Sequence, residues 1–506
     1  MTSVENFNSQ LSQGYDFSPL VALGQAKYKE KVTDIQVGIP LSMLNRHGLI
    51  AGATGTGKTK TVQLLVEGCA LAGVPTLVMD MKGDISGLAV AGEAKDFILE
   101  RYSQFGKEYI PHGFDTEFMS LTGKTGYQRR TTIIELGPLM LAQMLELNDT
   151  QTSALSAIFL YCDREGLALL DLEDLQSVLK YLSQKEINED FSAEYGLLSP
   201  ATLSVILRKT ITLEQQEGKV LFGEPSLDID DLLTTNSKGE GKITIFKLED
   251  SQSKPNLFCT AVLGILAELY TQLPEAGDLK QPKLVMIIDE AHLLFQLASP
   301  ALQQQIETMI KLIRSKGVGI FFCTQLPDDI PAPILSQLGT KIQHALRAFT
   351  ERDRKAMKTA VENYPITEFY TTSELITSLG VGEILFTTLN PKGIPTPLAH
   401  VYNYTPRSRM DVLSSDELQG FLEKSSLVTY YNQVIDRDSA TEILSKKLDT
   451  DDRKSSSGDD SSGPSLLSKI VKSKIVKDLT KSAGNSVVRE LLGYLGIKVR
   501  KNKTFF

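Results

Sequence analysis

Five short runs along the chain are apolar at nearly every position and rich in β-branched residues. Such runs predict strands that are buried on both faces, because a strand with one exposed face alternates apolar and polar side chains. Segments with the helical spacing of apolar residues lie between several of them, and this alternation predicts an α/β fold with a mostly parallel central sheet. The predicted strands are 47–53, 74–81, 241–248, 282–290 and 317–325, and the predicted helices are 58–72, 256–273 and 300–316.

The predicted strands are unevenly spaced, which indicates a large insertion in the core. The long interval between the second and third strands is β-like near 108–135 and helical in character beyond it. We therefore predict that 96–240 is a mostly helical insertion. The core would then consist of a first part, 1–95, and a second part, 241–402.

The character of the sequence changes after the second part of the core. A helical extension is predicted for 403–447, and the segment 448–465 is rich in Ser, Asp and Gly, which is typical of a disordered linker. The last segment, 466–506, carries eight Lys and two Arg against two acidic residues, so its net charge is +8 (10 − 2). As a helix it would be basic and amphipathic. It could contact acidic lipid, nucleic acid or a protein partner, or pack on its own chain.

Composition limits the classes of function. The chain has 506 residues and a formal net charge of −9, so any contact with nucleic acid must come from a local basic patch. None of its cysteines, Cys69, Cys162, Cys259 and Cys323, forms a C-x-x-C pair, which argues against a zinc site or a disulfide framework. The polar N-terminus lacks a secretory apolar region and no segment reaches the length of a membrane span, so we expect a cytoplasmic location.

A glycine-rich segment joins the first predicted strand to the first predicted helix and matches the pattern G-x-x-x-x-G-K-[ST] in full. Glycines let the backbone approach a phosphate chain and point successive N–H groups at its oxygens, and the helix that follows presents the positive end of its dipole. Lys58 supplies a charge for the β- and γ-phosphates, and the Thr59 hydroxyl is suited to Mg²⁺. The predicted nucleotide-binding residues are Gly52, Ala53, Thr54, Gly55, Thr56, Gly57, Lys58 and Thr59.

The predicted strand 282–290 ends in two carboxylates, Asp289 and Glu290. Together with a phosphate loop, this pair predicts that Asp289 holds Mg²⁺ through water and that Glu290 polarises the attacking water. Glu290 favours hydrolysis over phosphoryl transfer to a small acceptor, because a kinase has to exclude water. ATP and Mg²⁺ are therefore the predicted cofactors.

Polar residues that end two other predicted strands are candidates for the same edge of the sheet. Gln325 could sense the γ-phosphate or orient water, and a loop-capping role is the alternative. Asp80, Lys82 and Asp84 end the second strand, where Asp84 could contribute to the magnesium shell or to coupling. A turn explains the K-G-D sequence nearly as well. His292 is expected to be structural.

Beyond these motifs, the chain resembles the HerA/FtsK superfamily of ring ATPases and, within it, the bacterial HerA-like NTPases of the YjgR type. The similarity covers roughly 15–402. The resemblance implies a phosphate-loop NTPase fold of the RecA/HerA-FtsK type, with Gln325 as sensor beside the loop and the carboxylate pair. The similar stretches include GLIAGATGTGKTKTVQLL, GVPTLVMDMKGDISGLA, PKLVMIIDEAHLLF, IRSKGVGIFFCTQLPDDIPAPILSQLG and QHALRAFTERDRKA.

The resemblance also implies an arginine that reaches into the site of a neighbouring subunit. In the superfamily this arginine lies on the helix before the sensor strand, a position that Arg314 holds here, and Arg347 and Arg352 are further candidates. Such an arginine stabilises the charge on the transferring phosphoryl group. An ordinary surface role is the alternative for Arg314. HerA proteins proper carry a β-barrel before the phosphate loop, and the segment that precedes the loop here is too short for a full barrel.

The sequence thus predicts a Mg-dependent ATP hydrolase. The resemblance implies a homo-oligomeric ring, such as a hexamer, that acts on DNA as a helicase-like or translocase-like motor. The alternative is a nucleotide-dependent switch or assembly ATPase that an anionic membrane or a protein partner recruits through 466–506.

Overall fold

The computed structural model describes residues 3–215, 218–249, 255–277, 279–296, 300–347, 351–433, 435 and 439–446. By its internal packing the chain divides into two units. The first, called the sheet unit below, comprises 1–130 and 225–434, and the second, called the helical unit, comprises 131–224 and 435–506. The predicted linker and basic tail, 448–465 and 466–506, lie outside the described residues.

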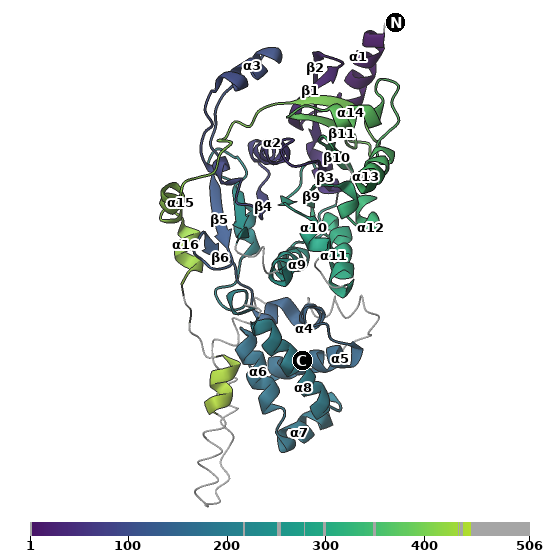
Figure 1. Ribbon diagram of the computed structural model, residues 1–506. Coiled ribbons are helices and arrows are strands. Elements are labelled where there is room, and N and C mark those ends of the chain that lie inside the picture. The colour runs from purple at the N-terminus through teal and green to yellow at the C-terminus, as the bar shows by residue number, and fades with distance from the viewer. Residues whose placement is uncertain are drawn as a thin grey trace, which may run out of the picture. The chain divides into compact units, whose positions relative to one another are not determined.

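A mixed sheet of twelve strands forms the centre of the sheet unit (Figure 1). The strands are β1 (Leu20–Tyr28), β2 (Lys31–Pro40), β3 (Gly48–Ala51), β4 (Thr76–Asp80), β5 (Thr116–Ser120), β6 (Tyr127–Gln128), β7 (Ile243–Lys247), β8 (Leu284–Ile288), β9 (Val318–Thr324), β10 (Thr340–Gln343), β11 (Glu383–Thr387) and β12 (Ala399–Asn403). Their order across the sheet is β2-β1-β12-β11-β10-β3-β9-β8-β4-β7-β5-β6. The run from β10 to β6 is parallel throughout, and the pairings from β2 to β10 at the other end are antiparallel.

The predicted α/β fold with a mostly parallel sheet is confirmed, and all five predicted strands lie in the parallel part. The antiparallel end is outside the prediction. The first half of β2 contains exposed and half-buried positions only and so lacks a continuous apolar run. The residues before the phosphate loop form a helix and the β1–β2 hairpin at the edge of this sheet.

Helices cover both faces of the sheet. On β9 the adjacent residues Phe321 and Phe322 point to opposite faces. Phe321 joins a core cluster with Val62 and Leu65 of α2, whereas the Phe322 ring lies 5.8 Å from Phe295 of α10. Within the described residues, no helix has the length and apolar character needed to cross a bilayer. The helices of the sheet unit are α1 (Ser3–Gly14), α2 (Lys58–Leu71), α3 (Asp96–Gln104), α9 (Pro255–Gln272), α10 (His292–Gln296), α11 (Pro300–Ile313), α12 (Ala332–Leu335), α13 (Glu351–Glu362), α14 (Thr372–Ser378), α15 (Ser415–Leu422) and α16 (Ser426–Tyr431).

The helical unit contains α4 (Ile133–Met144), α5 (Asp149–Glu165), α6 (Leu172–Tyr181), α7 (Lys185–Tyr195) and α8 (Pro200–Gln215), with a further helical stretch at 440–446. Capping boxes start α4, α5 and α6, at Thr132, Asn148 and Asp171. The unit takes a narrower range than the predicted insertion 96–240, because β5 and β6 pair with the central sheet.

A buried ion pair joins the end of β6 to α9 inside the sheet unit. Arg129 Nη2 lies 2.8 Å from Glu268 Oε1, and the two side chains are 0% and 7% exposed. Gly264 leaves room for the guanidinium, because a Cβ at this position would lie 2.6 Å from Arg129 Nη2. Both charges are therefore removed from water, and the ion pair compensates part of that cost.

We predict that Arg129→Ala lowers the free energy of unfolding by about 3–5 kcal/mol, because it breaks a buried ion pair and removes the guanidinium from beside the Glu268 carboxylate. Urea denaturation followed by circular dichroism measures this change. Lys95→Ala is the control, since Lys95 forms an exposed ion pair with Glu93 in the same unit. A loss no larger than that of the control would contradict the assignment.

Candidate functional site

The phosphate loop connects the end of β3 to the start of α2. Its backbone is left-handed at Gly55 (φ 78°) and Gly57 (φ 104°), a conformation that glycine adopts at no steric cost. Gly57 is the N-cap of α2, so the first helical turn, with its unpaired N–H groups, begins directly at Lys58. The loop therefore has the N–H-rich, positively polarised geometry that suits a chain of phosphates.

The two strands that flank β3 hold the first residues of this loop. Gly52 N donates to Gln325 O after β9 (3.2 Å), and Ala53 N donates to Ala345 O after β10 (2.9 Å). The loop thus starts from a backbone position that both neighbouring strands determine.

A buried histidine supports the far side of the loop. The Thr56 carbonyl accepts from Gly382 N (3.3 Å) and from His344 Nδ1 (3.0 Å). Burial lowers the pKa of His344 to about 3, so its ring is neutral at physiological pH. His344 and Gly382 are outside the sequence prediction. The strand that precedes His344, β10, is Thr-Lys-Ile-Gln, with one apolar residue, so the sequence carries no clear signal that marks this position.

The side chains of Lys58 and Thr59 both lie within the site. Lys58 Nζ donates to Gly52 O (2.7 Å) and Ala53 O (3.2 Å) of its own loop. Burial lowers the pKa of Lys58, and the positive charge of Lys82 lowers it further. Thr59 Oγ1 donates to Asp84 Oδ2 (3.1 Å), which connects the loop to a group of carboxylates.

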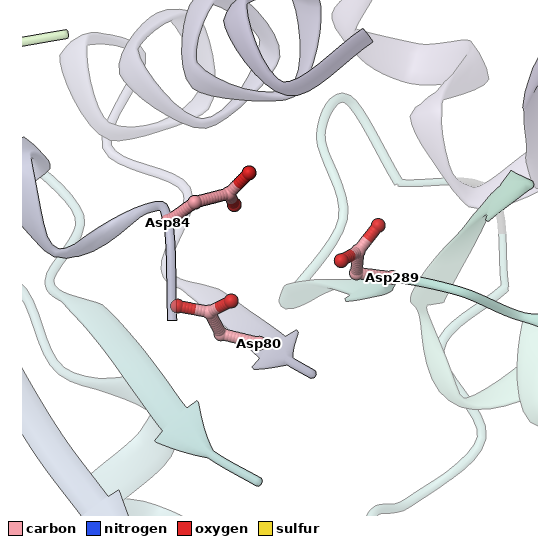
Figure 2. A group of neighbouring side chains, drawn as sticks. All are labelled: Asp80, Asp84 and Asp289. Atoms are coloured by element: carbon pink, nitrogen blue, oxygen red, sulfur yellow. The ribbon is translucent and has the colours of Figure 1, made fainter. Parts of the chain in front are cut away.

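Three aspartates form this group (Figure 2). Asp80 ends β4, Asp84 lies in the loop after it, and Asp289 faces them from the end of β8, with one oxygen of each within 4.8 Å of the others. Burial raises the pKa of Asp80 to about 7, and the charge of Asp84 adds to the shift. Burial also raises the pKa of Asp289 to about 6, with a contribution from the charge of Glu290.

A divalent cation would fit these residues. Among the described residues Asp84 Oδ1 is buried without a hydrogen-bond partner, and clustered carboxylate and hydroxyl oxygens are the ligands that Mg²⁺ prefers. Thr59 and Asp289, the predicted metal residues, both border the group. The structure adds Asp80 to these candidate metal residues. From the sequence, Asp80 was noted only as a polar residue at the end of a strand.

Two basic side chains lie against the Glu290 carboxylate. Its Oε1 forms an ion pair with Lys82 Nζ, and its Oε2 lies 3.0 Å from His292 Nδ1. Burial raises the pKa of Glu290, but the nearby His292 and Lys82 side chains outweigh burial and lower it to about 2. The backbone of Glu290 is left-handed, with φ 48°, which is a strained conformation for a residue with a side chain. His292, expected to be structural, therefore contacts the residue proposed as the water-polarising base.

Gln325 lies at the predicted edge of the sheet, next to the phosphate loop. Its carbonyl contacts the loop and its side chain is exposed. The preceding Thr324 donates its hydroxyl to Asp329 Oδ2 (2.6 Å), which caps the turn after β9. Gln325 thus lies beside the loop through its backbone, and its sensor role stays a proposal.

Arg314 lies at the other end of β9. It starts the short 3-10 helix η6 (Arg314–Lys316), and seven strand residues then lead to the phosphate loop. At about 3.3 Å per residue this is a separation of roughly 20 Å, so Arg314 cannot reach the loop of its own chain. Arg347 is exposed and lies two residues after Ala345, on the side of its own loop. Arg352 falls within α13, and its side chain is outside the described set.

A phosphate loop, a carboxylate group and a base-like glutamate at one edge of a largely parallel sheet define a phosphate-loop NTPase site. The family model for the helicase HerA-like C-terminal domain matches residues 25–463, and the chain belongs to this family. The narrower YjgR-type assignment stays a prediction. A comparison with curated proteins gave no match.

Solved structures also resemble the chain. The unbound conjugative coupling protein TrwB shares 14% identity over 81% of this chain and 94% of its own, with a TM-score of 0.48. VirB4 of Thermoanaerobacter pseudethanolicus shares 15% over 80% and 100%, with a TM-score of 0.49. TrwB in complex with ADP and Mg²⁺ shares 14% over 79% and 100%, with a TM-score of 0.47. Because these identities and scores are low, the family assignment rests on the family model alone.

The raised pKa values predict how pH and Mg²⁺ act on stability. The pKa values of Asp80 (about 7) and Asp289 (about 6) exceed those of an unfolded chain, so the stability they contribute is present at low pH and is lost as pH rises through 6–7. We expect Mg²⁺ to raise the melting temperature of the nucleotide-free protein more at pH 8 than at pH 5, because the cation needs ionised ligands.

Thermal melts with Mg²⁺ and with a chelator at both pH values measure this effect. Asp80→Asn should reduce the difference that Mg²⁺ makes at pH 8, and the exposed Asp34→Asn should leave it unchanged. An equal Mg²⁺ effect in all three proteins would show that Asp80 does not bind the cation.

Proposed function

We propose that this protein is a Mg²⁺-dependent ATP hydrolase that works as a homo-oligomeric motor on DNA. The observation that carries the hydrolase part is the meeting of the phosphate loop, the three aspartates and Glu290 at one edge of the sheet. Membership of a family described as helicase HerA-like supports the motor part.

In this proposal each residue at the edge has a separate task. Backbone N–H groups of the phosphate loop and the Lys58 ammonium bind the β- and γ-phosphates. The oxygen of a water attacks the γ-phosphorus while the bond between the γ-phosphorus and the β–γ bridging oxygen breaks. Glu290 takes the proton that the water loses. ADP and inorganic phosphate result. Bound Mg²⁺ would add positive charge beside the phosphate oxygens, and the residues placed to hold it are Thr59, Asp80, Asp84 and Asp289.

Arg314 lies far from its own loop, so the trans-acting role that the resemblance implies for it requires an oligomer. An arginine that acts on a phosphoryl group has to approach it, and Arg314 could do so only in the site of a neighbouring subunit. The use of ATP as the nucleotide, the number of subunits in the ring and the binding of DNA are all parts of this proposal. The net charge of −9 restricts DNA contacts to a local basic surface.

We expect Glu290→Gln to bind ATP and to lose turnover by about 100-fold or more, because the amide cannot accept the proton from water. Lys58→Ala should lose ATP binding itself, since it removes the charge from the phosphate loop. Steady-state phosphate release and equilibrium ATP binding separate the two effects. The control is Glu93→Gln, an exposed glutamate paired with Lys95, and turnover of Glu290→Gln at the control level would refute the base assignment.

The motor part predicts that double-stranded DNA stimulates hydrolysis in an oligomeric fraction. The stimulation should be several-fold at low salt and should decrease as salt rises, because phosphate contacts release counterions. Size-separated wild-type protein, assayed with and without DNA, provides the measurement. Unstimulated turnover by a monomer would end the DNA-motor proposal and leave the hydrolase proposal standing.

A further inference from the structure

The contact that the proposed mechanism does not use is the ion pair between Lys82 and Glu290. Lys82 lies in the loop after β4, and Glu290 follows β8, the strand next to β4 in the sheet. The lysine side chain is 43% exposed, whereas the Glu290 side chain is 8% exposed. Of the two partners, the lysine therefore has the freedom to move.

Glu290 is restrained from three directions. Lys82 engages one carboxylate oxygen, His292 lies 3.0 Å from the other, and the backbone is left-handed. A carboxylate paired with an ammonium is a weaker proton acceptor than one without such a partner, because the positive charge favours its ionised form. If Glu290 takes a proton from water, its ion pair with Lys82 must loosen during the reaction.

The charges around Lys82 indicate what would displace it. Lys82 lies near Asp84 and Asp289 as well as Glu290, and its charge also acts on Lys58 of the phosphate loop. The ammonium groups of Lys58 and Lys82 thus lie at the same edge of the sheet, and Lys58 belongs to the phosphate loop. The terminal phosphate of a nucleoside triphosphate carries more charge than one carboxylate, and it would compete with Glu290 for Lys82.

We propose that Lys82 is a positioning residue that holds Glu290 until a nucleoside triphosphate binds, and then transfers its ammonium to the terminal phosphate. This inference rests on the proposed ATP hydrolase function. The transfer releases one oxygen of Glu290 at the moment when the substrate is in place. A diphosphate lacks the group that Lys82 would bind, so it leaves the ion pair intact.

Binding of ADP and of a non-hydrolysable ATP analogue, each with Mg²⁺, tests the transfer by isothermal titration calorimetry on the full chain. Lys82→Met should weaken the analogue by about tenfold, the size of a charge-assisted hydrogen bond, and should change ADP binding by less than about twofold. Lys82→Arg should recover part of the analogue affinity because it keeps the charge. Lys95→Met, a change at an exposed lysine, should alter neither affinity.

A double-mutant cycle distinguishes coupling between Lys82 and Glu290 from direct repulsion between Glu290 and the phosphates. Glu290→Gln removes the competing carboxylate, so it should tighten the analogue in the presence of Lys82 and have a much smaller effect in the Lys82→Met background. The proposal is overturned if Glu290→Gln tightens the analogue equally in both backgrounds, or if Lys82→Met weakens ADP and the analogue to the same extent.

These measurements use binding and do not depend on turnover. If the wild-type protein binds both nucleotides but releases no phosphate from ATP, the hydrolase proposal fails while the cycle still decides the role of Lys82. If the wild type hydrolyses ATP and the cycle shows no coupling, only the Lys82 inference fails.

Discussion

The parallel alignment of β3, β9, β8 and β4 is the constraint on which the whole site depends. In this register Ala51 pairs with Thr324, and Met79 pairs with Ile288, so the carboxyl ends of these strands reach one edge of the sheet together. Side chains that follow parallel strands leave the sheet at the same edge. Segments separated by more than two hundred residues, at Asp80 and Asp289, therefore meet without any local sequence signal that pairs them.

This alignment has an electrostatic cost. It buries several carboxylates close together, and the raised pKa values of Asp80 and Asp289 show that their ionised forms are disfavoured. Cations at the same edge offset the cost, as the contact of Glu290 with Lys82 and His292 shows. A cation that binds beside the aspartates therefore increases the stability of the folded protein. An anion that binds at the lysines does the same. Substrate and metal binding are thereby linked to the stability of the fold.

The sequence was sufficient for the parts of the fold whose signal is local. An unbroken apolar run identifies a buried strand, and the glycine spacing before Lys58 identifies the loop and the start of α2. The strand order, the antiparallel end and the boundary of the helical unit depend on pairing between distant segments, which no single stretch records. His344 and the contact of Lys82 with Glu290 were missed for the same reason, since a contact between segments far apart in the chain leaves no spacing in the sequence.

The helix that starts at the phosphate loop is also fixed along its length. Gln63 donates to the Arg409 carbonyl (3.1 Å), and the buried Glu67 accepts from Ser408 N (2.9 Å), so one face of α2 holds the segment that follows β12. The loop at Lys58 thus lies between a sheet edge that sets its start and a helix that is anchored one to three turns later. Such support from both sides holds binding groups in place before the ligand arrives, which reduces the ordering that binding has to bring about. The flexible members of the site are then the long side chains, and the exposed Lys82 is the one whose present partner is the proposed base.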